Sequence, residues 1–218
     1  MVLLSASACG LRKLLLVCEN YATAHGLRYN VTKTQYMVFE PRGYRIGEVP
    51  PIQLNGTPLE RVNGFKYLGH IVSSDMKDNM DIERERRALS VRANMIARKF
   101  ARCTKAVKVT LFRAYCTSLY TCSLWVCYTQ RAYGALRVQY NNAFRVLVGL
   151  PRFCSASGMF AMARMDCFYA TIRKRCSSLV RRVRASPNPI LRSIADRFDC
   201  PYLRHCCEMH VSCSPYFV

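Results

Sequence analysis

The chain has 218 residues, of which 51% are hydrophobic and 21% charged, and its formal net charge is +20 at pH 7. The length allows one large domain or two small ones, and the composition excludes a disordered chain. Because a strongly basic surface opposes folding by self-repulsion unless a polyanion binds it, the charge indicates nucleic acid as a partner, with an anionic membrane surface as the alternative.

The first part of the chain has the pattern of a mixed α+β structure. Residues 1–4 are expected to form a short buried strand, and residues 7–25 an amphipathic helix that ends at Gly26. Residues 34–39 are rich in β-branched and aromatic side chains and predict a second strand.

Two more β features follow a loop at residues 41–51. Residues 52–62 predict a hairpin that turns at Asn55-Gly56, a dipeptide typical of tight hairpin turns. Residues 65–72 alternate between two faces and are the best strand candidate in the chain.

Beyond Asp75 the sequence is helical in character. A helix over residues 81–103, capped by Asp78 or Asn79, places its apolar side chains on one face. The charge-free run at residues 114–130 favours a buried helix over a membrane span, because it is short for a span and rich in Ser and Thr. The remaining helices are expected over residues 107–130, 132–148, 157–184 (broken near Asp166) and 189–198.

The positive charge is concentrated in this helical part. The net charge is +3 over residues 1–80, +10 over 81–150 and +7 over 151–218. From Arg86 to Met165 there are 14 Lys or Arg and no Asp or Glu. A solvated basic face is the ordinary explanation of such a helix, but a surface that needs only solubility would mix both signs. The pattern therefore favours binding to phosphates.

The 13 cysteines are scattered and odd in number, which indicates reduced thiols in an intracellular protein rather than a disulfide framework. The tail has side chains that can bind zinc, but it lacks the C-x2-C pair of a standard finger, so zinc binding is the weaker interpretation. The tail residues that could bind zinc are Cys200, His205, Cys206, Cys207, His210 and Cys213.

Residues 173–175 and 181–182 are weak candidates for an import signal.

Two short phrases carry a family resemblance. Residues 26–34 read GLRYNVTKT, and residues 64–73 read GFKYLGHIVS. In this order and at this separation they resemble the end of the palm domain of non-LTR (LINE-type) retrotransposon reverse transcriptases. In that family an aromatic-x-Asp-Asp hairpin directly precedes a Met-Val-Leu-Leu-Ser strand, and residues 1–5 here read MVLLS. The resemblance implies that the chain starts one or two residues after the catalytic aspartates.

The resemblance also implies roles for residues of both phrases. Lys33 matches a lysine that lies beside the nucleotide triphosphate, where it would donate a proton or contact the nucleotide. A solvated lysine at the entrance of a strand is the alternative. The second phrase matches the primer grip, in which a glycine permits close approach of another backbone, and its alternative is a core strand with a bulge. The primer-grip-like residues are Phe65, Tyr67, Leu68 and Gly69.

By the same resemblance the chain is an α+β palm end followed by a mainly α-helical thumb and C-terminal region. Residues 1–75 would be a partial palm with a primer-grip-like hairpin, 76–110 a thumb-like basic helix, 111–198 a helical C-terminal region and 199–218 an irregular Cys/His tail. The thumb-like part would follow the backbone of a template–primer duplex through Arg84, Arg87, Arg98, Arg102, Lys105 and Lys108.

The implied function is that of a fragment of an RNA-directed DNA polymerase that lacks the catalytic Asp-Asp pair and has no polymerase activity alone. Mg²⁺ would serve only the intact polymerase, so no cofactor and no metal site are expected in this chain. The implied partners are an RNA template, a DNA primer, their heteroduplex and the missing palm and fingers of the parent protein, with no membrane, and the implied location is nuclear. Two alternatives are a stand-alone basic nucleic-acid-binding protein and an inert product of a decayed element.

Overall fold

The computed structural model describes residues 1–40, 47–197 and 199–211. The chain is 56% helix and 8% strand, which confirms a mixed α+β class with a predominance of helix. It forms two compact units, one of Met1–Tyr67 with Ile71–Met76 and the other of Leu68–His70 with the chain from Lys77 onward. The main change of unit falls between Met76 and Lys77, one residue from the boundary expected at residue 75.

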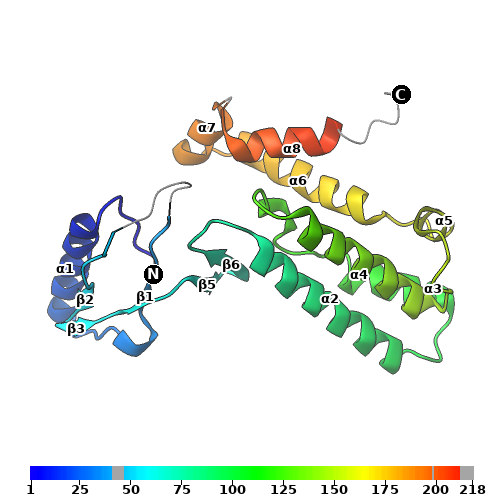
Figure 1. Cartoon of the computed structure of the whole chain (residues 1–218), viewed down its shortest axis with the longest axis horizontal. Helices are drawn as coiled ribbons and strands as arrows, with labels where there is room; N and C mark the ends of the chain where they lie inside the picture. The colour runs from blue at the N-terminus through cyan, green and yellow to red at the C-terminus, as the bar shows by residue number, and fades with distance from the viewer. Residues whose placement is uncertain (41–46, 198, 212–218) are drawn as a thin grey trace. The chain divides into compact units, whose positions relative to one another are not determined.

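The first unit is built on helix α1 (Ala8–Ala24) and short strands. The Ser7 hydroxyl caps α1 by accepting a hydrogen bond from the backbone N–H of Gly10 at 3.0 Å. The helix lies against the strand pair β2–β3 (Figure 1). The core of this unit is small and apolar, with buried Leu15, Ile52, Leu54 and Leu59. The helix predicted over residues 7–25 is confirmed.

Strands β2 (Gln53–Leu54) and β3 (Thr57–Pro58) pair antiparallel around Asn55-Gly56, which confirms the predicted turn, but the second strand, predicted at residues 59–62, comes earlier in the chain. Both turn residues have positive φ, 50° and 73°, which is the geometry of a tight hairpin turn. The strand predicted over residues 34–39 is reduced to β1 (Gln35–Tyr36), which pairs in parallel with β4 (Glu60–Arg61).

Two strand predictions for this part are wrong. Residues 1–4 form no strand, and Met1 and Leu4 are exposed. Residues 65–72 are not one strand but a hairpin of β5 (Gly64–Tyr67) and β6 (His70–Ser73). The chain reverses at Leu68-Gly69, whose φ values are 46° and 87°. Glycine reaches such values without steric cost, which suits Gly69 to the turn. The alternation of side chains between two faces continues on both sides of the turn, so the sequence resembled a single strand.

The second unit is a set of packed helices (Figure 1). Helix α4 is central and packs against α2, α3 and α6, while α6 also packs against α7 and α8. Aromatic rings fill the core: Phe112 of α3 meets Tyr140 and Phe144 of α4 edge-on, at centroid distances of 5.3 and 5.0 Å. The elements are α2 (Asn79–Lys99), α3 (Lys105–Tyr115), the 3-10 turn η2 (Cys122–Leu124), α4 (Gln130–Val148), α5 (Ala156–Met162), α6 (Phe168–Arg184), α7 (Pro189–Ala195) and α8 (Pro201–Val211).

Most helix predictions for this unit are confirmed, including the break near Asp166, where α5 and α6 are separate. The helix predicted over 107–130 is wrong beyond Tyr115. From Cys116 to Thr129 the chain is irregular apart from η2. The run contains Ser and Thr, whose hydroxyls compete for backbone groups. The Thr117 hydroxyl, for example, donates to the Arg113 carbonyl at 2.8 Å.

The tail predicted to be irregular, residues 199–218, is helical over its first half. Helix α8 begins at Pro201, a residue suited to the first helical position. It packs against α6, and Leu203 and Cys206 are buried. Burial of this apolar side overrides the irregular pattern of the sequence. None of the helices in the described ranges combines the length and the apolar character needed to cross a lipid bilayer.

Candidate nucleic-acid interface

Four exposed cationic side chains meet where α2 ends and α3 begins, a surface that we call the α2–α3 corner. Arg98 and Lys99 lie in the last turn of α2, Arg102 lies in the link, and Lys105 is the first residue of α3. Within the described part of the chain, none of the four has a carboxylate within ion-pair distance. The corner is therefore a surface of uncompensated positive charge.

The helix dipoles explain the positive charges at Arg98 and Lys99 but not the one at Lys105. Cations in the last turn of a helix interact favourably with its dipole, so Arg98 and Lys99 also suit the end of α2. Lys105 stands at the opposite end of a helix dipole, in the first turn of α3, where a cation is unfavourable. The Thr104 side chain already caps α3. Nothing in α3 itself favours a positive charge at Lys105.

Lys108, also predicted to contact phosphate, has a structural role in the corner. Its side chain is half-buried, and its Nζ donates a hydrogen bond of 2.9 Å to the carbonyl of Ala101 in the α2–α3 link. Lys108 therefore connects the link to α3.

Arg87, predicted as a phosphate contact, is only partly committed within the chain. Its Nε donates to Glu83 at 2.8 Å, while 76% of its side chain is exposed. Arg86 donates two further hydrogen bonds to the same carboxylate, at 2.6 and 2.8 Å. The hydrogen bonds from Arg86, followed by those from Arg87, lower the pKa of Glu83 to about 2. One carboxylate thus balances two guanidinium groups, and a net positive charge remains.

Arg84, also predicted as a phosphate contact, is held by hydrogen bonds within the chain. Its Nε donates to Asp81 at 2.7 Å, its Nη1 to Glu85 at 3.1 Å and its Nη2 to Thr121 at 2.9 Å. Burial lowers the pKa of Arg84, but its hydrogen bonds to Asp81 and Glu85 outweigh this effect, so the pKa is raised. Arg84 lies on the helix flank that faces the irregular segment, and it neutralises two buried carboxylates there.

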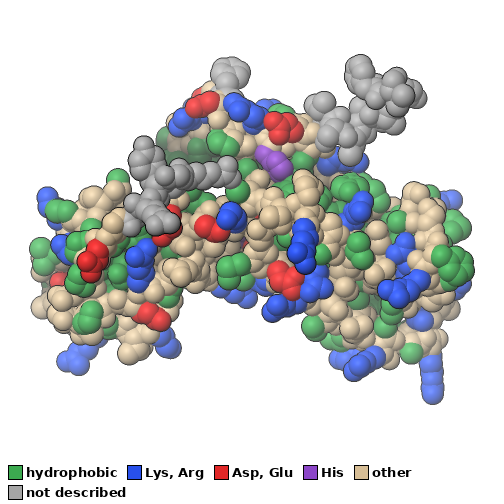
Figure 2. Space-filling model, in the orientation of Figure 1, with side chains coloured by type: hydrophobic (Ala, Val, Ile, Leu, Met, Phe, Trp, Pro, Cys, Tyr) green, Lys and Arg blue, Asp and Glu red, His purple; other side chains and the backbone are tan. Residues whose placement is uncertain are grey.

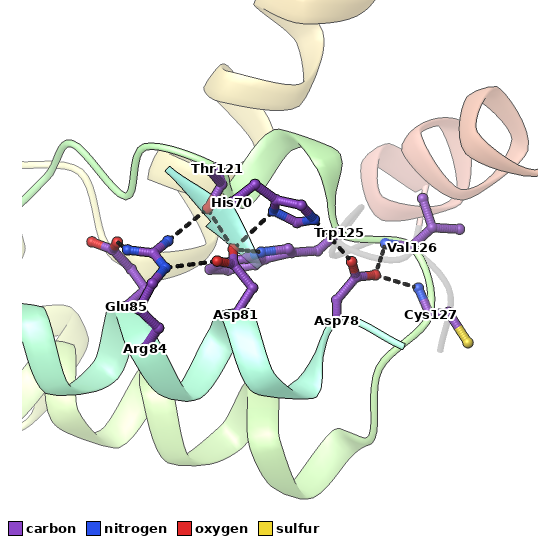
Figure 3. Close-up of polar contacts among 9 residues, drawn as sticks. All are labelled: His70, Asp78, Asp81, Arg84, Glu85, Thr121, Trp125, Val126 and Cys127. Atoms are coloured by element: carbon purple, nitrogen blue, oxygen red, sulfur yellow. Dashed lines mark hydrogen bonds and ion pairs between the residues drawn. The ribbon is translucent and has the colours of Figure 1, made fainter. Parts of the chain in front are cut away.

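The carboxylate of Asp81 is the centre of a buried polar network (Figure 3). It accepts hydrogen bonds from Arg84, from the Thr121 hydroxyl, from the Trp125 indole at 2.8 Å and from His70 Nδ1 at 3.1 Å. Asp81 is fully buried. A network in which each member is satisfied rigidifies the structure around it. These contacts connect α2 to the hairpin turn and to the irregular segment before α4.

Asp78 precedes α2 but does not cap it. Its carboxylate accepts from the backbone N–H groups of Val126 and Cys127, both at 2.8 Å (Figure 3). Burial raises the pKa of Asp78 despite these two bonds. Asn79 similarly accepts from the backbone N–H of Thr129 at 2.9 Å. The two residues predicted to cap α2 instead satisfy the backbone of residues 126–129.

This network was missed at the level of sequence, although a signal existed. Asp81 and Glu85 are four residues apart and flank Ile82 and Leu89 of the apolar stripe. Carboxylates at helical spacing beside a buried stripe indicate burial with hydrogen-bond or ion-pair partners.

Lys33 belongs to the first unit, whereas the corner belongs to the second. It is exposed at the end of a 3-10 turn, η1 (Val31–Lys33). The Asn30 side chain caps this turn by accepting from the Lys33 backbone N–H at 3.1 Å, and the Thr34 hydroxyl donates to the Asn30 carbonyl at 2.8 Å. The phrase at residues 26–34 thus has a local structural use, and it leaves the Lys33 side chain at the surface.

The primer-grip-like residues are divided between the two units. Phe65 and Tyr67 are in β5 of the first unit, half-buried and exposed respectively, whereas Leu68 and Gly69 belong to the second. The neighbour of Gly69 within the chain is the side-chain ring of Tyr120. A Cβ at Gly69 would lie 3.2 Å from that ring.

Helix α6 carries a second basic surface, of which the sequence indicated only weak import signals. Six of its 17 residues are basic: Arg173, Lys174, Arg175, Arg181, Arg182 and Arg184. On the face shown in Figure 2, Lys and Arg side chains are spread over the helices, and Asp and Glu side chains are few. The sequence signal for this surface was the high density of basic residues. Their spacing gave no such signal, because a helix distributes such a run over more than one of its sides.

The zinc interpretation of the tail gains no support. Among the residues whose side chains the structure describes, no three His, Cys, Asp or Glu come together as metal ligands. His205 is half-buried beside Tyr128, with Nε2 3.2 Å from the hydroxyl, and burial lowers its pKa. The side chain of His210 and the whole of Cys213 lie outside the described residues.

The arrangement has the chemistry of a phosphate-binding surface: exposed guanidinium and ammonium groups on rigid helices, without nearby carboxylates. Comparison with known proteins adds no relative. No protein-family model matches the chain, and neither does any curated protein or any solved structure.

Proposed function

We propose that this chain binds a nucleic-acid duplex through the α2–α3 corner, as the thumb-bearing portion of a non-LTR reverse transcriptase. The main support for this proposal is the corner itself, where four exposed cations lie without carboxylate partners among the described residues. The two phrases at residues 26–34 and 64–73 support the family. The placement of Lys105 against its own helix dipole supports an external anion, because such a charge needs stabilisation from outside the helix.

The proposed ligand is the sugar–phosphate backbone rather than the bases. Flexible, exposed Lys and Arg side chains at a helix corner suit phosphate oxygens. Binding would therefore be largely independent of sequence, and its free energy would come mainly from release of counterions. The template–primer heteroduplex is the form that the family resemblance implies.

We propose that the chain has no polymerase activity of its own. A polymerase needs carboxylates that can reach Mg²⁺. Asp81 is fully buried and its carboxylate accepts hydrogen bonds from side chains on three sides of it, and Asp78 is held by two backbone N–H groups. Both carboxylates are committed to structure. Primer extension by the purified chain in the presence of Mg²⁺ would contradict this part of the proposal.

The test compares two charge-matched double variants. Arg98→Glu/Arg102→Glu alters the corner, and Arg131→Glu/Arg192→Glu makes the same change of charge at exposed positions on α4 and α7. Binding to a short RNA–DNA heteroduplex is measured by fluorescence anisotropy between about 50 and 200 mM salt. We expect the corner variant to bind more weakly, and its log–log salt slope to fall by about one unit for each phosphate that it no longer neutralises. Equal losses in the two variants would refute the corner as the binding surface.

One observation favours the alternative of an inert product. Several apolar side chains of α1 are exposed: Leu14, Leu16, Val17 and Tyr21. Exposed apolar surface of this kind promotes aggregation when its partner is missing. Light scattering and thermal unfolding of the purified chain distinguish the alternatives, because a binding protein unfolds cooperatively as a monodisperse species and an inert product aggregates.

A further inference from the structure

A basic hollow lies on the second unit, where α6 meets the end of α3 and the loop between α5 and α6. Its volume is about 470 Å³, within the range of about 300–1,000 Å³ that is usual for small-ligand sites. It is separate from the α2–α3 corner, because none of the corner residues lines it. The lining residues are Arg113, Thr117, Arg164, Met165, Asp166, Thr171, Lys174, Arg175 and Ser178.

The charge of this hollow is strongly unbalanced. Four cations line it, and Asp166 is the one acidic side chain among its lining residues. Lys174 Nζ contacts both oxygens of Asp166, at 2.6 and 2.7 Å. In the described ranges, Arg113, Arg164 and Arg175 have no ion-pair partner. Asp166 therefore neutralises Lys174 and leaves three guanidinium groups for an external anion.

The backbone at the rim is held in an unfavourable conformation. Arg164 has φ of 49°, a left-handed value that is uncommon for a residue with a long side chain. Two contacts hold it there. The Arg164 N–H donates to the Ala161 carbonyl at 3.0 Å, and its carbonyl accepts from Arg113 Nη2 at 3.2 Å. This contact connects α3 to the loop after α5, and the guanidinium groups of Arg113 and Arg164 both line the hollow. The Met165 N–H also donates to the Phe160 carbonyl, at 2.9 Å, so the left-handed residue belongs to the C-terminal cap of α5.

Hydroxyl groups complete the lining. Ser178, half-buried on α6, can donate to an anion. Thr171 is buried, with its hydroxyl 3.4 Å from that of Tyr140, which donates in turn to the Asp166 carbonyl at 3.3 Å. This chain of hydrogen bonds fixes the backbone of Asp166 at the edge of the hollow. Guanidinium groups beside a hydroxyl are the donors that phosphate oxygens accept.

We propose that this hollow, lined by Arg113, Arg164, Arg175 and Ser178, is a binding site for a single phosphate group, either at the end of a nucleic-acid strand or on a small molecule. The site goes beyond the duplex surface at the α2–α3 corner and does not depend on it. Asp166 tunes the affinity, because its negative charge opposes the incoming phosphate while its contact with Lys174 holds that cation at the site.

Isothermal titration with inorganic phosphate, at constant ionic strength adjusted with sodium chloride, tests the site. We expect Arg113→Gln/Arg175→Gln to lose affinity by about tenfold or more, since two charged hydrogen-bond donors are removed. The control, Arg131→Gln/Arg192→Gln, removes the same charge elsewhere and should retain affinity. Equal affinities in the two double variants, or no phosphate binding by the wild-type chain, would overturn the proposal.

Asp166→Asn separates binding from a purely structural role. The amide keeps the size of the side chain and removes its negative charge, so we expect phosphate to bind more tightly, by about threefold or more. If the residue only supported the fold, affinity would fall together with the melting temperature, and that result would count against the site. Circular dichroism melting curves for every variant monitor the fold.

A second arm identifies the source of the phosphate. A 5′-phosphorylated oligonucleotide is compared with the same strand ending in a 5′-hydroxyl. Tighter binding of the phosphorylated strand, abolished in Arg113→Gln/Arg175→Gln, supports a strand end as the ligand, and a response to inorganic phosphate alone supports a small molecule. The corner variant Arg98→Glu/Arg102→Glu should keep its phosphate affinity, so failure of the duplex proposal and failure of this one are distinguishable.

Discussion

The indole Nε1 of Trp125 donates a hydrogen bond of 2.8 Å to the carboxylate of Asp81, 44 residues earlier in the chain. Both side chains are buried, with exposed fractions of 2% and 0%. The bond connects the irregular segment before α4 to the first turns of α2. A buried charge with several donors is costly to disturb, because removal of either partner leaves the other without compensation.

Replacement of Asp81 by alanine should therefore destabilise the second unit strongly. Arg84, Thr121 and Trp125 would lose a buried acceptor, and we expect a loss of about 3–5 kcal/mol in the free energy of unfolding. Trp125 is the one tryptophan of the chain, so urea unfolding followed by its fluorescence reports on this unit. The exposed Asp196 provides a control, and Asp196→Ala should stay within about 0.5 kcal/mol of wild type. A loss below about 1 kcal/mol for Asp81→Ala would contradict a central role of the network.

The turn between β5 and β6 should respond in opposite directions to two substitutions. Leu68 has φ of 46° and a 75% exposed side chain, so Leu68→Gly relieves backbone strain at little cost in packing and should stabilise by up to about 1 kcal/mol. Gly69→Ala forces a Cβ into left-handed backbone, 3.2 Å from the Tyr120 ring, and should destabilise by about 1–2 kcal/mol. Differential scanning calorimetry measures both, and shifts of the same sign would refute the assigned geometry.

Acid should weaken the chain partly through Glu83. Its pKa is lowered to about 2 by hydrogen bonds from Arg86, so its contribution to stability is present above the unfolded pKa of about 4.3 and is lost as the pH falls from there towards 2. Because 38% of the side chain is exposed, solvent screening limits the contribution to about 1 kcal/mol or less. Glu83→Gln should flatten the stability profile over this pH range, as measured by urea unfolding. An unchanged profile would show that the ion pairs contribute nothing.

One glycine inside α4 and one directly after it allow the same substitution to be tested in two backbone settings. Gly149 ends the helix with φ of 69°, and Gly149→Ala should destabilise by about 1 kcal/mol. Gly134 lies inside the helix with open space around its Cβ position, and Gly134→Ala should stabilise by about 0.5–1 kcal/mol. Thermal unfolding of the two variants checks the pair. Destabilisation by Gly134→Ala would imply a steric clash at that position.

Local patterns were sufficient for the parts of the fold that are locally determined. Helices α1, α4 and α6 follow the helical spacing of their apolar residues, and the Asn55-Gly56 hairpin follows its turn chemistry. The charge pattern likewise led to the exposed cations of the corner. These features need only neighbours in the sequence.

Features that depend on distant partners could not be predicted in this way. The exposure of Arg84 is decided by Asp81, Glu85 and Thr121, and the last of these is 37 residues away. The segment after Tyr115 lacks charge and so resembles a buried helix, but its conformation is set by hydrogen bonds to Asp78 and Asp81. Composition cannot show which carboxylate a buried donor will meet.

The hydrogen bond between Asp81 and Trp125 also constrains the order in which the second unit can fold. Helix α2 leaves the ribosome well before residues 121–127. Until they arrive, Asp81 lacks its donors Thr121 and Trp125, and Asp78, directly before the helix, lacks the N–H groups of Val126 and Cys127. Closing a loop of this length costs entropy before any favourable interaction forms. Helix α2 alone is therefore expected to be poorly structured during synthesis, and the unit should become protease-resistant only once Trp125 has emerged.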